Sequence, residues 1–176
     1  MEIANEVDAK YFPDVRCSKN GVPLISDLFH KADELSSFDI LTFINSDIIL
    51  PNNFLDPIQI IRNQIPKFLS VGHRWDMNID TLINFNKQTI VNSFWEKSKD
   101  QSIKNSPAAI DYFIYKKNMF KHIPDFAVGR MGYDNWLIWY ARRKLIPVID
   151  LSKQLKVIHQ NHSYNFHNLK ENPNIS

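Results

Sequence analysis

The segment Phe38–Leu50, FDILTFINSDIIL, decides the fold that we expect of this 176-residue chain. Its first part, Ile40–Ile44, is an apolar run with β-branched and aromatic members, which is typical of a strand buried on both faces. Three polar residues, Asn45, Ser46 and Asp47, interrupt this run before apolar residues resume it. We therefore predict a central strand whose end carries polar side chains.

The polar triplet has two interpretations. A carboxylate between two apolar runs is costly to bury alone, so Asp47 should lie at a strand end or beside a partner. Ligands bind at strand ends in open α/β sheets, and oxygen donors there suit Mg²⁺ or Mn²⁺ carrying a diphosphate. A capping role for Asp47 in the next turn explains the residue equally well, and the triplet alone does not decide between the two.

The composition indicates one globular domain spanning residues 1–176. Hydrophobic residues make up 44% of the chain and charged residues 23%, and the length is sufficient for a hydrophobic core. The net charge of +2 is too small to indicate binding to nucleic acid or to a membrane. We therefore expect no nucleic-acid partner.

Several classes of protein are disfavoured by the sequence. The single cysteine, Cys17, cannot form an internal disulfide and fits a reducing, cytoplasmic compartment. No apolar run approaches the roughly 20 residues of a membrane span, and the polar N-terminus does not resemble a signal peptide. The four glycines form no G-x-G-x-x-G motif or P-loop, which excludes the two commonest phosphate-binding loops.

Hydrophobic periodicity predicts alternating strands and helices along the chain. Helices are expected over 23–35, 54–65, 80–100 and 133–144, and strands over 9–12, 40–44, 67–72, 110–115, 146–150 and 155–159. Such alternation predicts an α/β sandwich with a mainly parallel central sheet. The polar tail, residues 168–176, is expected to be flexible.

Three further segments carry side chains that suit chemistry. In Gly72–Asp76, GHRWD, Arg74 suits a diphosphate and Trp75 a sugar ring, although an Arg–Asp surface pair beside a core Trp explains the segment as well. In Gly129–Trp136, GRMGYDNW, Asp134 falls in the first turn of a helix, where capping alone would account for it.

The third segment is Ile158–Tyr164, IHQNHSY. His159 and His162 are three residues apart after a predicted strand and suit a metal ligand or a phosphate contact. A pair of histidines is often incidental. No cysteine cluster or H-E-x-x-H motif accompanies them, which argues against a structural zinc site.

Taken together and in this order, NSD, GHRWD, IDYF, GYDNW and IHQNHSY resemble a bacterial-type family of nucleotide-sugar glycosyltransferases with the GT-A fold. The resemblance extends from about residue 9 to residue 165. It implies metal-dependent transfer of a sugar from a nucleoside diphosphate sugar to a hydroxyl-bearing acceptor. The implied cofactor is Mn²⁺ or Mg²⁺.

The resemblance also implies roles for individual residues. Asp47, with Asn45 beside it, matches the D-x-D-like position that holds the metal and the diphosphate, although Asn replaces the first Asp. The ligand that completes the metal site would be His159, which ends a strand, or His162. Asp134 matches the carboxylate that deprotonates the acceptor hydroxyl in inverting members. Asp111 and Trp136 would then line the acceptor side.

One departure from the family pattern leads to the alternative functions. A GT-A domain opens with a strand–helix–strand unit that binds the nucleoside, and this chain begins beyond it, so about 30 residues are expected to be absent. The loss would expose a sheet edge for a second copy or a completing chain. The alternatives to an active transferase are therefore an inactive nucleotide- or sugar-binding remnant and an interaction protein.

Overall fold

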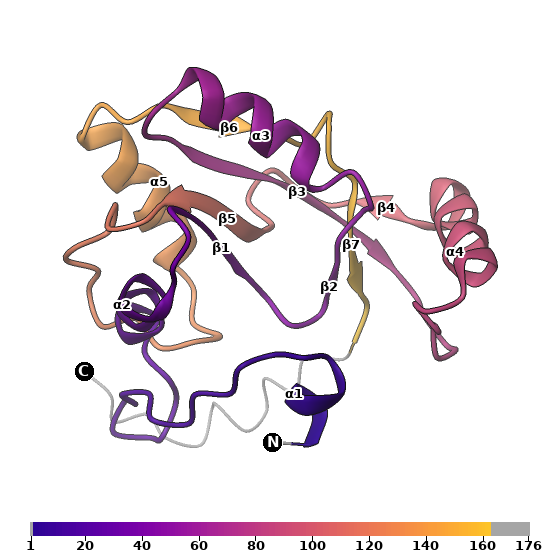
Figure 1. Cartoon of the computed structure of the whole chain (residues 1–176), viewed down its shortest axis with the longest axis horizontal. Coiled ribbons are helices and arrows are strands. Elements are labelled where there is room, and N and C mark those ends of the chain that lie inside the picture. Colours follow the sequence, from indigo (N-terminus) through magenta and orange to yellow (C-terminus); the bar gives the residue numbers. More distant parts are fainter. Residues whose placement is uncertain (1, 163–176) are drawn as a thin grey trace.

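The computed structural model describes residues 2–162 and has an α/β architecture (Figure 1). The predicted tail, residues 168–176, lies outside the described residues. The helices are α1 (Glu2–Glu6), α2 (Ile25–Leu35), α3 (Leu55–Gln64), α4 (Gln88–Gln101) and α5 (Tyr133–Arg143). The strands are β1 (Ile40–Ile44), β2 (Ile48–Ile49), β3 (Leu69–Met77), β4 (Ile103–Lys104), β5 (Ile110–Lys116), β6 (Val148–Asp150) and β7 (Val157–Gln160).

The sheet is mixed rather than mainly parallel, which corrects the prediction. Its order is β1-β5-β3-β7-β2, and β4 and β6 also pair with β3. β3 runs parallel to β6 and β7 but antiparallel to β4 and β5, while the outer pairs β1–β5 and β2–β7 are antiparallel. Periodicity gives the succession of strands and helices, but it does not give the direction in which a strand returns to the sheet.

The predicted central elements form close to their expected positions, and two segments differ. The segment 9–12 forms no strand, and the helix expected from residue 80 begins only at Gln88, after a polar loop. β3 is longer than expected and continues to Met77, because β7 and β4 pair with its second half. The GHRWD segment is therefore part of a strand and not a loop.

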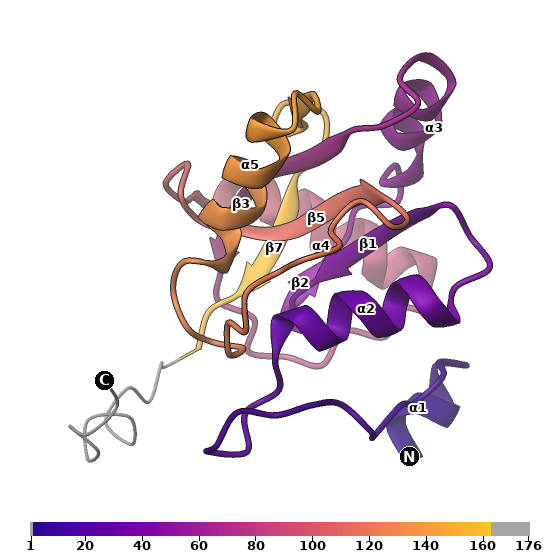
Figure 2. The same ribbon diagram turned by 90° about the vertical axis from the view of Figure 1, so that its left-hand side faces the viewer.

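Two hydrophobic clusters cover opposite faces of the sheet. α2 and α5 pack on one face, where Phe29 stacks on Phe43 and Tyr115 with ring centroids 5.0 and 4.9 Å apart. α3 packs on the other face against Tyr112 and Ile114. Figure 2 shows α2 and α5 in front of the sheet strands. None of the helices in the range 2–162 is long and apolar enough to span a membrane.

A β-bulge lies in β5 opposite Gly72, close to the point where the pairing of β3 on this side passes from β5 to β4. Val71 is opposite Phe113 and His73 is opposite Ile110, so two residues of β5, Asp111 and Tyr112, face the single residue Gly72. Glycine is required there, because a Cβ atom on Gly72 would lie 2.0 Å from the hydroxyl oxygen of Tyr112. Bulges bend a strand and occur often beside functional sites. This one brings Asp111 to the region described below.

We expect Gly72→Ala to lower the free energy of unfolding by about 1–3 kcal/mol through overpacking. Tyr112→Phe removes the clashing hydroxyl, which is buried and has no hydrogen-bond partner among the described residues. The ring Cζ atom remains 2.9 Å from the added Cβ, so the double variant should recover part of the loss. Urea denaturation of the four proteins as a double-mutant cycle measures the coupling, and strictly additive losses would contradict the proposed contact.

Candidate metal centre

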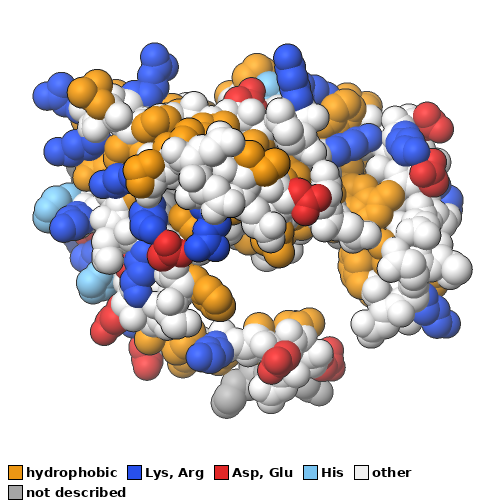
Figure 3. All heavy atoms as spheres, turned by 45° about the horizontal axis from the view of Figure 1, so that its top comes forward, with side chains coloured by type: hydrophobic (Ala, Val, Ile, Leu, Met, Phe, Trp, Pro, Cys, Tyr) orange, Lys and Arg blue, Asp and Glu red, His pale blue; other side chains and the backbone are white. Residues whose placement is uncertain are grey.

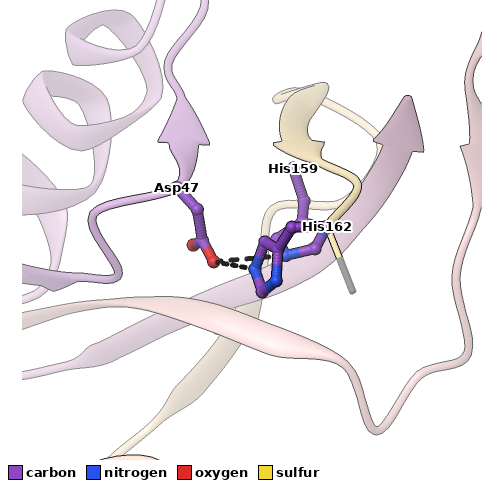
Figure 4. A group of neighbouring side chains, drawn as sticks. All are labelled: Asp47, His159 and His162. Atoms are coloured by element: carbon purple, nitrogen blue, oxygen red, sulfur yellow. Dashed lines mark hydrogen bonds and ion pairs between the residues drawn. The ribbon is translucent and has the colours of Figure 1, made fainter. Parts of the chain in front are cut away.

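Three side chains that suit a metal ion meet at one edge of the sheet. Asp47 lies in the turn between β1 and β2, His159 lies on β7, and His162 follows β7 by two residues. Backbone pairing brings them together, because Ile48 is opposite His159 and the Gln160 N–H donates to the Asp47 carbonyl at 3.1 Å. Figure 4 shows the three side chains pointing toward one another. Their position is therefore a consequence of the β2–β7 register.

One carboxylate oxygen of Asp47 faces both imidazoles. Asp47 Oδ2 lies 3.3 Å from His159 Nε2 and 3.0 Å from His162 Nε2. One donor atom from each residue lies within 4.8 Å of the other two. The second oxygen, Asp47 Oδ1, is buried and has no hydrogen-bond partner among the described residues. A buried carboxylate oxygen without a partner is costly, so this corner of the sheet has unused capacity to bind a cation.

A second carboxylate orients His159. Asp76, on the neighbouring strand β3, places Oδ1 3.1 Å from His159 Nδ1, and the imidazole is only 2% exposed. The Asp76 carboxylate thus faces Nδ1 of the imidazole, and Nε2 of the same ring faces the Asp47 carboxylate. A carboxylate–histidine pair of this kind is the usual support of a metal-bound histidine.

Arg74 holds Asp76 and Asp111 in place. Its Nε atom lies 2.9 Å from Asp76 Oδ1 and its Nη1 atom 2.7 Å from Asp111 Oδ2, with side-chain exposures of 15%, 23% and 10% for Arg74, Asp76 and Asp111. Asn105 Nδ2 also donates to Asp76 Oδ2 at 2.5 Å. Both oxygens of Asp76 are thus engaged, which fixes the carboxylate that faces His159.

The remaining oxygen of Asp111 connects the network to β1 and α5. Asn45 Nδ2 donates to Asp111 Oδ1 at 2.6 Å, and the Asn45 N–H donates to the Asp111 carbonyl at 3.0 Å. The side chain of Tyr133, at the start of α5, also interacts with Asn45. Burial and the nearby carboxylates, Asp111 first among them, raise the pKa of Tyr133 to about 12, so its hydroxyl stays protonated at neutral pH.

The other predicted site residues lie apart from the network. Trp75 alternates with Arg74 and Asp76 along β3 and packs with Phe94 of α4, and Lys156 Nζ lies 4.4 Å from the centre of its ring. Trp136 packs on the α5 side of the core and stacks on Tyr140 with centroids 5.0 Å apart.

Asp134 and Ser46 lie near the ends of the elements that carry the site. Asp134 is in the first turn of α5, where its carboxylate accepts the N–H of Asn135 at 2.8 Å and does not cap the helix. Ser46 is exposed between Asn45 and Asp47. The roles predicted for Trp75, Trp136, Asp134 and Ser46 stay predictions, because no ligand contact tests them.

No protein-family model, curated protein or solved structure matches this chain.

Three contributors to the site were missed at the level of sequence. Asp76 was interpreted only as a surface partner of Arg74, because its contact with His159 depends on the β3–β7 register. Asn105 and Tyr133 were assigned no role. The position of Asp76, two residues after Arg74 and therefore on the same face of an extended strand, is the signal that the sequence offered.

Replacing Arg74 by Met should lower the free energy of unfolding by about 2–4 kcal/mol, because Asp76 and Asp111 would lose the cation that they share. Urea denaturation at neutral pH measures the loss. Arg62→Met is the matched control, because Arg62 pairs with Asp39 at 3.8 Å and both side chains are half exposed. Little change is expected in the control. Equal losses in the two variants would contradict a special role for Arg74.

Proposed function

We propose that this chain is a metal-dependent glycosyltransferase of the GT-A type, which transfers a sugar from a nucleoside diphosphate sugar to a hydroxyl acceptor. The observation that carries the proposal is the convergence of Asp47, His159 and His162, from the β1–β2 turn and the end of β7. The triplet that suits a diphosphate and the histidines that suit its metal thus lie at one edge of an α/β sheet. The GT-A arrangement of that sheet is part of the proposal.

The donor atoms fit a divalent cation. Two ligands at adjacent positions of an octahedral ion with bonds of about 2.1 Å lie about 3 Å apart, and Asp47 Oδ2 lies 3.0 and 3.3 Å from the two imidazole nitrogens. Imidazole nitrogens suit Mn²⁺ better than Mg²⁺, which prefers oxygen. We therefore favour Mn²⁺ of the two cofactors.

In the proposed chemistry, the cation stabilises the leaving group and the protein side chains position the cation. When bound, the cation neutralises charge on the departing diphosphate. Asp76 lies against Nδ1 of His159 and so orients Nε2 toward the proposed cation, and Arg74 keeps Asp76 in place. The two carboxylates beside the Arg74 guanidinium support positioning as its main role, rather than the diphosphate contact predicted from the sequence.

The acceptor side of the proposal depends on the start of α5. Ring contacts of Tyr133 with Phe43 and Phe113, at centroid distances of 6.0 and 6.1 Å, hold the first turn of α5 against β1 and β5. Asp134 is the next residue, and we propose that its carboxylate accepts the proton of the acceptor hydroxyl. Gly129 and Gly132, with φ of 74° and 111°, give the preceding loop a conformation that other residues rarely adopt. Asp111 and Trp136, the other residues predicted on the acceptor side, are engaged within the protein, Asp111 by Arg74 and Asn45 and Trp136 by Tyr140.

Mn²⁺ should stabilise the protein against thermal unfolding, and a nucleoside diphosphate should add to this only when Mn²⁺ is present. At about 100 times its dissociation constant, a ligand adds about 2.7 kcal/mol to the free energy of unfolding. Asp47→Asn should abolish the Mn²⁺ effect, and Asp76→Asn should weaken Mn²⁺ binding about 10- to 100-fold. Asp80→Asn, an exposed aspartate outside the cluster, is the control. A normal Mn²⁺ response in Asp47→Asn would refute the site.

Asp134→Asn separates a transferase from the alternative, a protein that binds nucleotide sugars without turnover. In a transferase, this variant should retain Mn²⁺-dependent binding of the donor and lose at least about 100-fold in the rate of sugar transfer, the lower range for a general base. Asn135→Asp restores a carboxylate one position away and serves as a geometric control in the Asp134→Asn background. Donor binding without turnover in the unmodified chain would favour the alternative.

A further inference from the structure

Leu145, the second residue after the end of α5, is unusual in two respects. Leu145 has a φ of 55°, in the left-handed region that favours glycine, and its side chain is 91% exposed. A leucine gains no burial here and adopts a conformation that glycine or asparagine would adopt with less strain. The folded chain alone therefore gives no reason for an apolar side chain at this turn.

A basic hollow adjoins Leu145. It has a volume of about 460 Å³, and its lining includes Lys67, Lys121 and Lys144 but no acidic residue. Lys144 lies over the ring of Tyr140, with Nζ 5.9 Å from the ring centre. Three ammonium groups around one hollow favour an anionic group, such as a phosphate, within it.

The exposed face of α5 also carries cationic and apolar side chains. Trp139 is 54% exposed, and it forms a shallow groove with Ile138, Arg142 and Arg143 among its neighbours. Residues 126–149 contain four cationic side chains and one acidic one, so the low net charge of the whole chain conceals a local excess. Figure 3 shows Lys and Arg side chains interspersed with hydrophobic ones on the left side of the molecule, where α5 lies.

We infer that the C-terminal half of α5 and the turn at Leu145 bind the surface of an anionic lipid bilayer. Leu145 and Trp139 would enter the headgroup region, where apolar and amphipathic side chains are stable. The lysines of the hollow, with Arg142 and Arg143, would face lipid phosphates. A bilayer fits better than a nucleic acid, because bases stack on aromatic side chains and not on leucine. An exposed leucine does insert into the apolar part of a membrane interface.

This inference does not rest on the proposed enzymatic function. The interacting residues lie at the end of α5 opposite Tyr133, and eleven helical residues separate the two ends by about 16 Å. Residues of the candidate metal centre are therefore unchanged in the variants that test membrane binding. A failure of either proposal leaves the other standing.

Flotation of the full chain with vesicles tests the inference. Vesicles with phosphatidylglycerol should bind the protein, whereas pure phosphatidylcholine vesicles should not, and binding should fall as salt is raised. Each cation near an anionic surface contributes about fivefold to partitioning, so K67Q/K121Q/K144Q should bind on the order of 100-fold more weakly. Leu145→Asn should bind several-fold more weakly while remaining as stable as the unmodified chain or more so, because asparagine tolerates the left-handed conformation.

The matched control is K87Q/K97Q/K153Q, which removes three exposed lysines outside this surface and should bind vesicles normally. Thermal melts of all variants establish that they are folded. Equal losses in the two triple variants would show a non-specific charge effect and overturn the inference. The same follows if anionic vesicles do not bind the unmodified chain, or if an RNA oligonucleotide binds through these lysines and vesicles do not.

Discussion

The guanidinium of Arg74 is the interaction on which the functional edge of this protein depends. It lies between two carboxylates from different strands, Asp76 of β3 and Asp111 of β5, in surroundings that are mostly removed from water. Two carboxylates so close would repel each other without it, and neither could be buried alone. Because Asp111 also binds Asn45 and Asp76 also faces His159, a single cation fixes the relative positions of four strands at the point where the candidate metal centre lies.

Local backbone geometry makes this arrangement possible. The bulge opposite Gly72 directs Asp111 and Tyr112 toward a single residue of β3, and Gly72 leaves room for the Tyr112 ring. Beyond the bulge, the second half of β3 pairs with β4 on one side and with β7 on the other, so that Asp76 is opposite His159. A side chain larger than hydrogen at position 72 would separate β3 from β5 at the point where Arg74 must reach Asp111. The core packing and the polar network therefore constrain one another.

The sequence predicts the secondary structure of individual segments correctly where the pattern is local. It does not predict which strands pair, in which direction, or with which residues opposite one another. The apolar run Ile40–Ile44 and the periodic pattern of α5 specify their own secondary structure. The mixed direction of the sheet, the bulge at Gly72 and the pairing of Asp76 with His159 depend on which strands meet. No periodicity carries that information. The grouping of Asp47 with both histidines was expected from a family resemblance, and here it follows from the β2–β7 register.

The two ends of α5 carry side chains of opposite charge, and the dipole of the helix favours this arrangement. Its N-terminal turn carries Tyr133 and Asp134 beside a cluster rich in carboxylates, whereas its last turn carries Arg142 and Arg143. The helix dipole favours an anion at the first end and cations at the second, so each set of charges stabilises the same helix. Leu137 and Ala141 anchor the helix between them in the core. A ligand at either end would therefore meet a preformed, rigid surface, and a bilayer bound at one end would leave the candidate metal centre at the other end open to water.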